Sequence, residues 1–94
     1  PVAVASPSAG LQPQIGYPTL QTVLAQRCYP CHGPAVQMKN VRLDSAPKVS
    51  LHAQAIYQQA VVARTMPLNN ATGITDAERY LIRQWFESGA SVTP

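Results

Sequence analysis

The amino-acid sequence predicts an all-α fold with three main helices, and three observations support this prediction. Apolar residues recur at helical spacing in residues 19–29 and again in residues 49–63. A helix-capping motif opens a third periodic stretch at residue 75. No stretch alternates between apolar and polar side chains for long enough to predict a strand.

The first predicted helix covers residues 19–29. Thr19 follows Pro18 and is a good N-cap candidate, because its hydroxyl can accept a hydrogen bond from an amide of the first turn. One face of this helix carries residues at spacings of three and four, namely Leu20, Val23, Leu24, Arg27 and Cys28. The dipeptide Gly33-Pro34 then interrupts the helical pattern.

The second predicted helix covers residues 49–63, and either Ser45 or Ser50 is its candidate cap. Its apolar stripe is broad, which is typical of a helix that is largely buried. The side chains available to face inward are Leu51, Ala55, Ile56 and either Gln59 or Ala60.

The third helix has the clearest start signal, because Thr75 and Glu78 form the pattern of a capping box. Gly89 is a plausible residue to end it. The large side chains of this helix, Tyr80, Leu81 and Trp85, are expected to pack against Leu20 and Leu24 of the first helix.

The chain of 94 residues has room for one domain. Residues 1–18 contain four prolines, two glycines and no charged side chain, so they are predicted to form a flexible linker. Residues 19–94 are then the folded domain. No apolar run is long enough to span a membrane.

The formal net charge is +3, from seven basic and four acidic residues. The basic residues are scattered, without a run and without interleaved aromatic side chains, so nucleic acid is not an expected partner. A small positive charge fits transient docking on an acidic protein surface. No general acid–base pair stands out, and no catalytic residue is predicted within this chain.

The sequence Cys28-Tyr29-Pro30-Cys31-His32 is the attachment signature for a c-type haem. Two thiols at this spacing can each bond one haem vinyl group, and the adjacent imidazole can then bind iron. We therefore expect one covalently bound haem c. Such a large apolar group would also help so small a chain to form a stable core.

Three other uses of the motif stay open. Cys28 and Cys31 could form a dithiol redox pair. That chemistry needs the first cysteine at the N-terminus of a helix, whereas the residues before Cys28 look helical and place it near a helix C-terminus. A zinc site would need a fourth ligand, such as His52 or a carboxylate. A plain structural disulfide is the simplest alternative, but it needs neither the short spacing nor the histidine.

Met66 is the candidate sixth ligand of the iron. Its thioether is a soft donor, and it lies 34 residues after His32, far enough for the chain to pass round a haem edge. Pro67 disfavours a helical conformation at Met66. Met38 has less reach, and His52 on a helix is more often a surface residue. A Met66 that only fills the core is the alternative.

Haem propionates would need partners, and three basic residues are candidates: Lys39, Arg42 and Arg64. Asn69 and Asn70 could bond a propionate or the Met66 sulfur, or could simply form a turn. The indole N–H of Trp85 is a further, weaker candidate.

Residues 19–91 resemble a class I cytochrome c domain, in the helix that ends at Cys-Tyr-Pro-Cys-His, in the Met-Pro loop and in the aromatic C-terminal helix. This resemblance implies a small all-α fold around one haem c. It also implies axial ligation by His32 and Met66, with Cys28 and Cys31 bonded to the haem, and one-electron transfer.

A narrower resemblance concerns the segments V-R-L-D-S, H-A-Q-A-I-Y-Q-Q-A-V-V and T-M-P-L-N-N-A-T-G-I-T-D-A-E-R. They are similar to the C-terminal cytochrome domain of bacterial membrane-bound urate oxidases. This implies a membrane-embedded urate-oxidising domain in the same chain, a periplasmic location and a downstream acceptor such as a cytochrome oxidase. The domain alone would be an electron carrier, and its parent an oxidoreductase.

Two alternatives to the fused domain remain. One is a free-standing periplasmic cytochrome c that carries electrons to a terminal oxidase. The other is a haem enzyme or gas sensor with a labile sixth site. Haem attachment of this type occurs outside the bacterial cytoplasm, so in each case we expect the chain to be a mature or excised exported segment.

Overall fold

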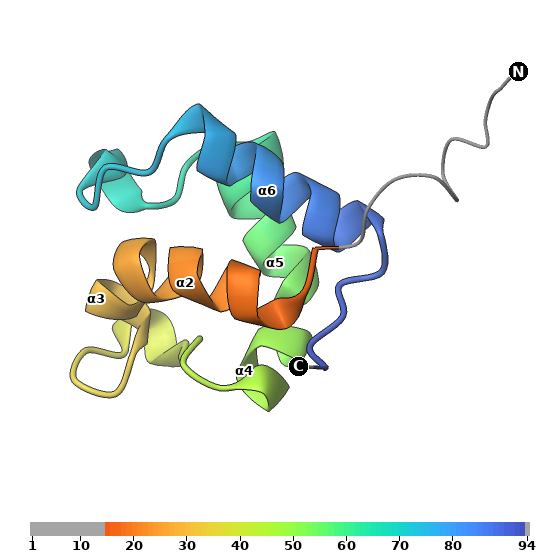
Figure 1. The fold of residues 1–94 in the computed structure, drawn as a ribbon. Coiled ribbons are helices and arrows are strands. Elements are labelled where there is room, and N and C mark those ends of the chain that lie inside the picture. The colour runs from red at the N-terminus through yellow and green to blue at the C-terminus, as the bar shows by residue number, and fades with distance from the viewer. Residues whose placement is uncertain (1–14, 94) are drawn as a thin grey trace, which may run out of the picture.

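The computed structural model describes residues 15–93, which form helices joined by loops (Figure 1). In chain order the longer elements are α2 (Tyr17–Arg27), α3 (Tyr29–His32), α4 (Ala46–Leu51), α5 (Ala53–Tyr57), the π-helix η2 (Gln58–Val62) and α6 (Asp76–Glu87). Two short 3-10 helices, η1 (Met38–Asn40) and η3 (Leu68–Asn70), lie in the connecting loops. Within residues 15–93 the sole β feature is one isolated bridge between His32 and Gln37. The all-α prediction is confirmed.

Helix α2 begins at Tyr17, two residues before the predicted start of the first helix. Gly16 is the N-cap and Pro18 lies in the first turn, where proline fits because its fixed φ suits a helix and its missing N–H is not needed. Tyr17 is only 7% exposed and belongs to the core. The rest of the predicted linker, residues 1–14, lies outside the described residues.

The predicted helix over residues 49–63 is present in three pieces. It starts early, at Ala46, with Ser45 in extended conformation at the N-cap position. The helical path breaks at His52, which has φ −103° and ψ 12°, and continues as α5 and η2. Ile56 and Ala60 are buried as expected, whereas Leu51 is 75% exposed. Ala55 and Gln59 are exposed as well, so part of the predicted inward face is open.

Helix α6 confirms the capping box. Thr75 accepts a hydrogen bond from the Glu78 amide, and the Glu78 carboxylate accepts one from the Thr75 amide. Gly89 follows the C-cap with φ 122°, a conformation that glycine adopts at little cost. Tyr80 is 57% exposed, so its predicted packing role was wrong.

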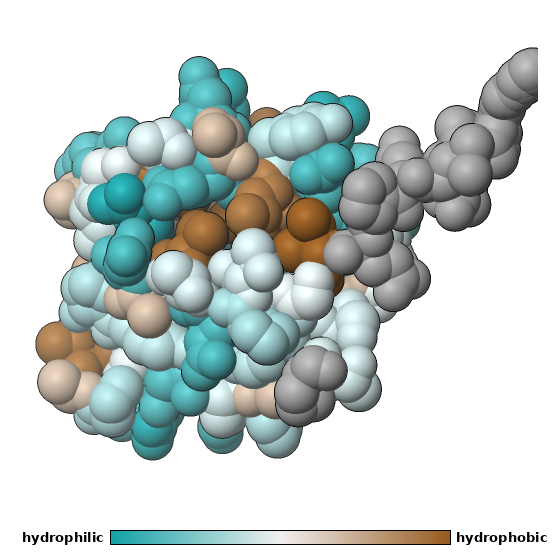
Figure 2. Space-filling model, in the orientation of Figure 1, coloured by the Kyte–Doolittle hydropathy of each residue, from teal (hydrophilic) through white to brown (hydrophobic). Residues whose placement is uncertain are grey.

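The centre of the domain is a seam between α2 and α6, which α5 crosses (Figure 1). The fully buried side chains are Trp85, Leu20, Leu24, Ile82 and Val49. Figure 2 shows a line of hydrophobic side chains that follows this seam on the surface. The Trp85 indole N–H donates to the Ser91 carbonyl at 2.7 Å, so this donor is satisfied by the chain itself. The predicted packing of Trp85 with Leu20 and Leu24 in one core is confirmed.

Candidate functional site

Cys28, Cys31 and His32 are held together in one turn at the junction of α2 and α3. Cys28 ends the first helix and starts the second, and its amide donates to the Leu24 carbonyl at 2.8 Å. The Cys28 carbonyl then accepts from the amides of Cys31 at 3.1 Å and His32 at 2.8 Å. Both thiols are free and partly exposed. The local backbone therefore presents all three predicted side chains from one rigid segment.

The imidazole of His32 is oriented by the loop that follows the motif. Its Nδ1 lies 3.2 Å from the Val41 carbonyl oxygen. A carbonyl can only accept, so the proton of this hydrogen bond is on Nδ1 and the lone pair of a neutral ring is on Nε2. The Leu43 amide also donates to the His32 carbonyl at 2.7 Å, which fixes the backbone. Metal-binding histidines are typically held this way, with one nitrogen bonded to the protein and the other free for the metal.

The thiol environment does not favour dithiol redox chemistry. Burial, followed by the neighbouring Cys31, raises the pKa of Cys28 to about 11. Reactive redox cysteines instead have lowered pKa values, usually at a helix N-terminus. Helix α3 has only four residues and offers a weak dipole. Within residues 15–93 no group of three His, Cys, Asp or Glu side chains is arranged to hold a metal ion, so the zinc alternative finds no ligand set there.

Met66 lies in the loop between η2 and η3, away from the motif in sequence. Its amide donates to the Gln59 carbonyl at 3.1 Å, and the Thr65 amide donates to the same oxygen at 2.8 Å. The Met66 carbonyl accepts from Arg79 Nη1 of α6 at 2.9 Å. The segment is not helical at Met66, as predicted from Pro67. Met66 is half-buried, and within residues 15–93 no hydrogen bond joins it directly to the motif.

The motif and the Met66 loop lie at the same end of the domain in the view of Figure 1, with α3 below and the loop before α6 above. The first turn of α6 connects them. Glu78 accepts from Arg27 at 2.9 Å and 3.3 Å, and Arg27 immediately precedes Cys28. Arg27 also donates to the Thr72 carbonyl at 2.5 Å, and the Thr72 hydroxyl donates back to the Arg27 carbonyl at 2.7 Å. The Thr75 amide, and then Arg27, hold the pKa of Glu78 below its usual value.

No pattern in the sequence predicted this connection. The capping pattern accounted for Glu78, and helical periodicity placed Arg27 on an apolar face. No local pattern links residues 51 positions apart, and the only available signal was a lone cation among apolar neighbours at the end of a helix.

Two of the three candidate propionate partners, Arg42 and Arg64, pair with carboxylates of the chain itself. Arg42 pairs with Asp44 at 2.9 Å and 2.5 Å, which lowers the pKa of this carboxyl group. Arg64 pairs with Asp76 at 2.5 Å. Lys39 has a left-handed backbone with φ 56°.

Asn69 and Asn70 form a turn, which was one of the two predicted roles for these residues. Asn69 and Asn70 both have positive φ, 53° and 49°. The Asn70 side-chain oxygen accepts from the Ile74 amide at 2.8 Å, and its nitrogen donates to the Ile74 carbonyl at 3.4 Å. These bonds shape the loop between Met66 and α6.

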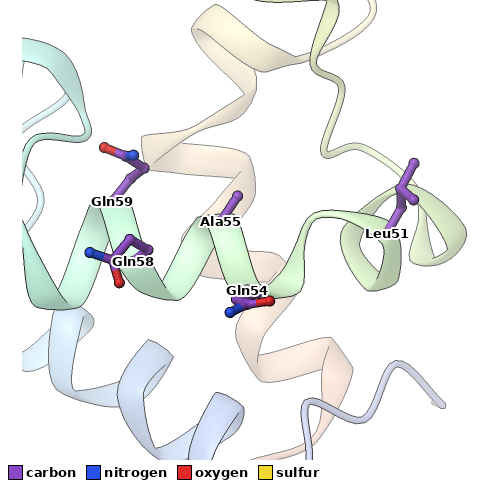
Figure 3. Close-up of a pocket in the computed structure, with 5 residues that line it drawn as sticks. All are labelled: Leu51, Gln54, Ala55, Gln58 and Gln59. Carbon is purple, nitrogen blue, oxygen red and sulfur yellow. The ribbon is translucent and has the colours of Figure 1, made fainter.

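Large hydrophobic side chains remain exposed in the segments that contain or connect the candidate ligands. Five of them are Val36, Met38, Leu51, Val62 and Leu68. An open hollow of about 600 Å³ runs along one face of α4, α5 and η2 (Figure 3). Leu51, Ala55 and Gln59 point to the same side of this helical stretch in the close-up. They are the predicted inward residues that the chain itself leaves uncovered.

Two buried hydroxyls accompany the motif. Tyr17 of α2 and Tyr29 of α3 each bury the side-chain oxygen without a hydrogen-bond partner among residues 15–93. Burial, and then the proximity of Tyr29, raises the pKa of Tyr17. Tyr29 belongs to the motif itself, and no sequence pattern indicated that its hydroxyl and that of Tyr17 would be buried.

Comparison with known proteins gave no match: no family model, no curated protein and no solved structure is similar to this chain. None of the helices in residues 15–93 has both the length and the apolar character needed to cross a membrane.

Proposed function

We propose that this domain transfers single electrons through one covalently bound haem c, as a class I cytochrome c does. Cys28 and Cys31 would bond the haem, and His32 and Met66 would be its axial ligands. The observation that carries the proposal is the orientation of His32. The Val41 carbonyl accepts a hydrogen bond from the Nδ1–H of His32, which leaves Nε2 for a metal, and the same turn holds two free thiols.

The donor set fits a haem c better than it fits the alternatives. Haem c supplies one-electron chemistry at iron when it is bound. The thiols belong to one short turn, as two thioether bonds to a single macrocycle require. The raised pKa of Cys28 disfavours a dithiol redox site, and the thioether of Met66 is a soft donor that is not among the usual ligands of zinc.

The exposed apolar side chains also support the proposal that the chain binds a large apolar group. Folded domains of this size need their large hydrophobic side chains for the core. Leu51, Val62 and Leu68 are instead more than half exposed. A haem held at Cys28 and Cys31 would give such side chains an apolar surface to pack against. Haem would then contribute to the core as well as to redox function.

We further propose that the domain accepts electrons from a membrane-embedded urate-oxidising domain of the same chain on the periplasmic side. A cytochrome oxidase or similar acceptor would receive them. Support for this part comes from the three sequence segments quoted above. One of them spans the Met66 loop and the start of α6, and another spans α5 and η2.

The decisive experiment is expression of the full chain in a host that attaches haem to exported cytochromes. Covalent haem should survive denaturation in the wild type and be lost in the double variant Cys28→Ala/Cys31→Ala. His/Met ligation predicts a weak ferric absorption near ~695 nm, here called the sulfur band. Met66→Ala should abolish the sulfur band, whereas the matched control Met38→Ala should keep it. A sulfur band that survives Met66→Ala would refute the ligand assignment.

The origin of the electrons needs a separate test. The reading frame upstream of Pro1 should encode hydrophobic spans if the domain is part of a membrane-bound urate oxidase. A signal peptide that ends near Pro1 would contradict the fusion and indicate a free-standing carrier.

A further inference from the structure

We propose that Arg79 is a positioning residue for the Met66 ligand. This inference rests on the proposed haem coordination and deepens it. Arg79 lies on α6 and is half-buried. Its Nη1 donates to two carbonyl oxygens from different segments, to Ala60 at 2.5 Å and to Met66 at 2.9 Å. One guanidinium nitrogen thus joins the last turn of η2 to the backbone of the candidate ligand.

The Ala60 carbonyl needs this donor because the helix ends around it. In a continuing α-helix, this oxygen would accept from the amide of residue 64. Arg64 instead has φ 59°, which turns the chain out of the helix. The π-helical pattern also shifts the last bond, so that the Ala63 amide donates to Gln58 at 2.8 Å. Arg79 fills the role of a cation that satisfies the terminal carbonyls of a helix.

The backbone of Met66 is consequently held at both its amide and its carbonyl. Its amide is bonded to the Gln59 carbonyl at 3.1 Å, and its carbonyl is bonded to Arg79 at 2.9 Å. The hydrogen bond from the Met66 amide is local, since Gln59 is seven residues earlier in the chain. The Arg79 bond comes from α6, the helix whose first turn also holds Arg27 beside the motif. Arg79 therefore ties the position of Met66 to the helix whose Glu78 also holds Arg27, the residue next to Cys28.

A weak axial ligand depends on such support. A thioether is neutral and can be displaced when its loop moves, so the fraction of time it stays bound depends on how firmly the loop is held. A hydrogen bond from a charged donor is roughly twice as strong as a neutral one. Loss of Arg79 should leave the loop attached through Gln59 but free to swing at the Met66 carbonyl.

The test compares Arg79→Ala, Arg79→Lys and Arg83→Ala in the full haem-loaded chain. Arg83 lies on the same helix, is about half exposed and, within residues 15–93, forms an ion pair with Glu87 at 3.2 Å and no other, so it is a matched control. Two readouts are used: the ferric sulfur band and the rate of carbon monoxide binding to the ferrous protein, which requires Met66 to leave. Arg79→Ala should weaken the sulfur band and speed carbon monoxide binding about tenfold, the factor equivalent to about 1.4 kcal/mol.

The conservative variant separates positioning from general damage. Arg79→Lys keeps a charged donor and should restore most of the sulfur band and the slow carbon monoxide rate, and Arg83→Ala should match the wild type. Should Arg79→Ala fail to load haem, the comparison passes to Arg79→Gln, which retains one donor group without the charge and should show the same direction of change. A normal sulfur band and a normal carbon monoxide rate in Arg79→Ala or Arg79→Gln would overturn the inference.

The outcome for the wild type separates this inference from the proposed function. A wild-type chain without covalent haem, or with haem but no sulfur band, would contradict the proposed function and remove the basis of the Arg79 assignment with it. A wild type that has the sulfur band, beside an Arg79→Ala variant that is unchanged, would contradict the Arg79 assignment alone.

Discussion

The two halves of the candidate site are built in opposite ways. In the motif, Cys28, Cys31 and His32 lie within five residues. Hydrogen bonds from the amides of Cys31 and His32 to the Cys28 carbonyl hold the turn. Met66 itself has no such turn around it, although local hydrogen bonds shape the later part of its loop. It is fixed by the Gln59 carbonyl from the preceding helix and by Arg79 from the following one.

The two regions differ in which contacts offset the conformational entropy that each loses on folding. A short turn needs few residues to be fixed before its hydrogen bonds form. The loop from Arg64 to Thr75 has local bonds around Asn70, but at Met66 its order also depends on the contact with Arg79, which forms only when α6 is docked. We therefore expect the motif to be robust to changes in α6 and the Met66 loop to be sensitive to them. Four variants test this expectation, from the largest effect to the smallest.

Trp85→Ala should destabilise both regions, because it removes the largest side chain of the packing between α2 and α6. Trp85 is fully buried between α2 and α6. Replacement of a buried tryptophan costs about 3–5 kcal/mol, a large share of the stability of a small domain. Chemical denaturation followed by circular dichroism should show this loss. The control Tyr80→Ala, on the exposed side of the same helix, should change the free energy of unfolding little, and an equal loss there would contradict the proposed core.

Gly33→Ala should damage the motif alone. A Cβ at Gly33 would lie 2.6 Å from the Tyr29 carbonyl oxygen, so the backbone at the end of α3 must shift. Overpacking of this kind costs about 1–3 kcal/mol. Thermal unfolding and the yield of covalent haem should both fall. Gly16→Ala is the control, because its nearest new contact is at 3.7 Å. Equal effects of the two substitutions would argue that the crowding at Gly33 is unimportant.

Glu78→Gln should loosen the link between the two regions. Glutamine can still complete the capping box, but the charge that pairs with Arg27 is lost. The expected cost is about 1 kcal/mol at neutral pH. Because the pKa of Glu78 is lowered in the folded state, its contribution is complete above the ordinary value of 4.5 and is lost as pH falls through the folded pKa.

The wild type and Glu78→Gln should therefore differ in stability at neutral pH and converge in acid. Urea denaturation at several pH values measures this convergence. Glu87→Gln, which removes a more exposed pair with Arg83, is the control and should be close to neutral. A difference that stayed constant down to low pH would show that the charge of Glu78 is not the cause.

Asn70→Gly should affect the Met66 loop alone and by the smallest amount. Glycine keeps the φ of 49° at no cost but removes two side-chain bonds to Ile74, so we expect a loss of about 1 kcal/mol. Asn69→Gly is the matched control: φ is 53°, and the Asn69 side chain makes no hydrogen bond within residues 15–93. Hydrogen exchange at the Ile74 amide should rise only in Asn70→Gly, and a similar rise in both variants would contradict this role.

Local signals in the sequence determined much of the fold and the motif half of the site. The apolar spacing of Leu20, Val23 and Leu24 placed them correctly in the core, and the capping box located the start of α6. The signature around Cys28 and His32 identified the candidate haem-binding side chains, which lie in one turn of the structure. These signals are local because helical periodicity, capping and covalent attachment all act over a few residues.

Other features depended on tertiary structure. Tyr17 joins α2 because its ring is buried against the domain, although Pro18 alone suggested a later start. The open face at Leu51 follows from the break at His52, which periodicity did not indicate. The pairing of Arg27 with Glu78 and of Arg79 with the Met66 carbonyl joins residues that only docking of α6 brings together. Long-range contacts between polar groups carry no periodic signal, because each one depends on where two surfaces meet rather than on the order of neighbouring residues.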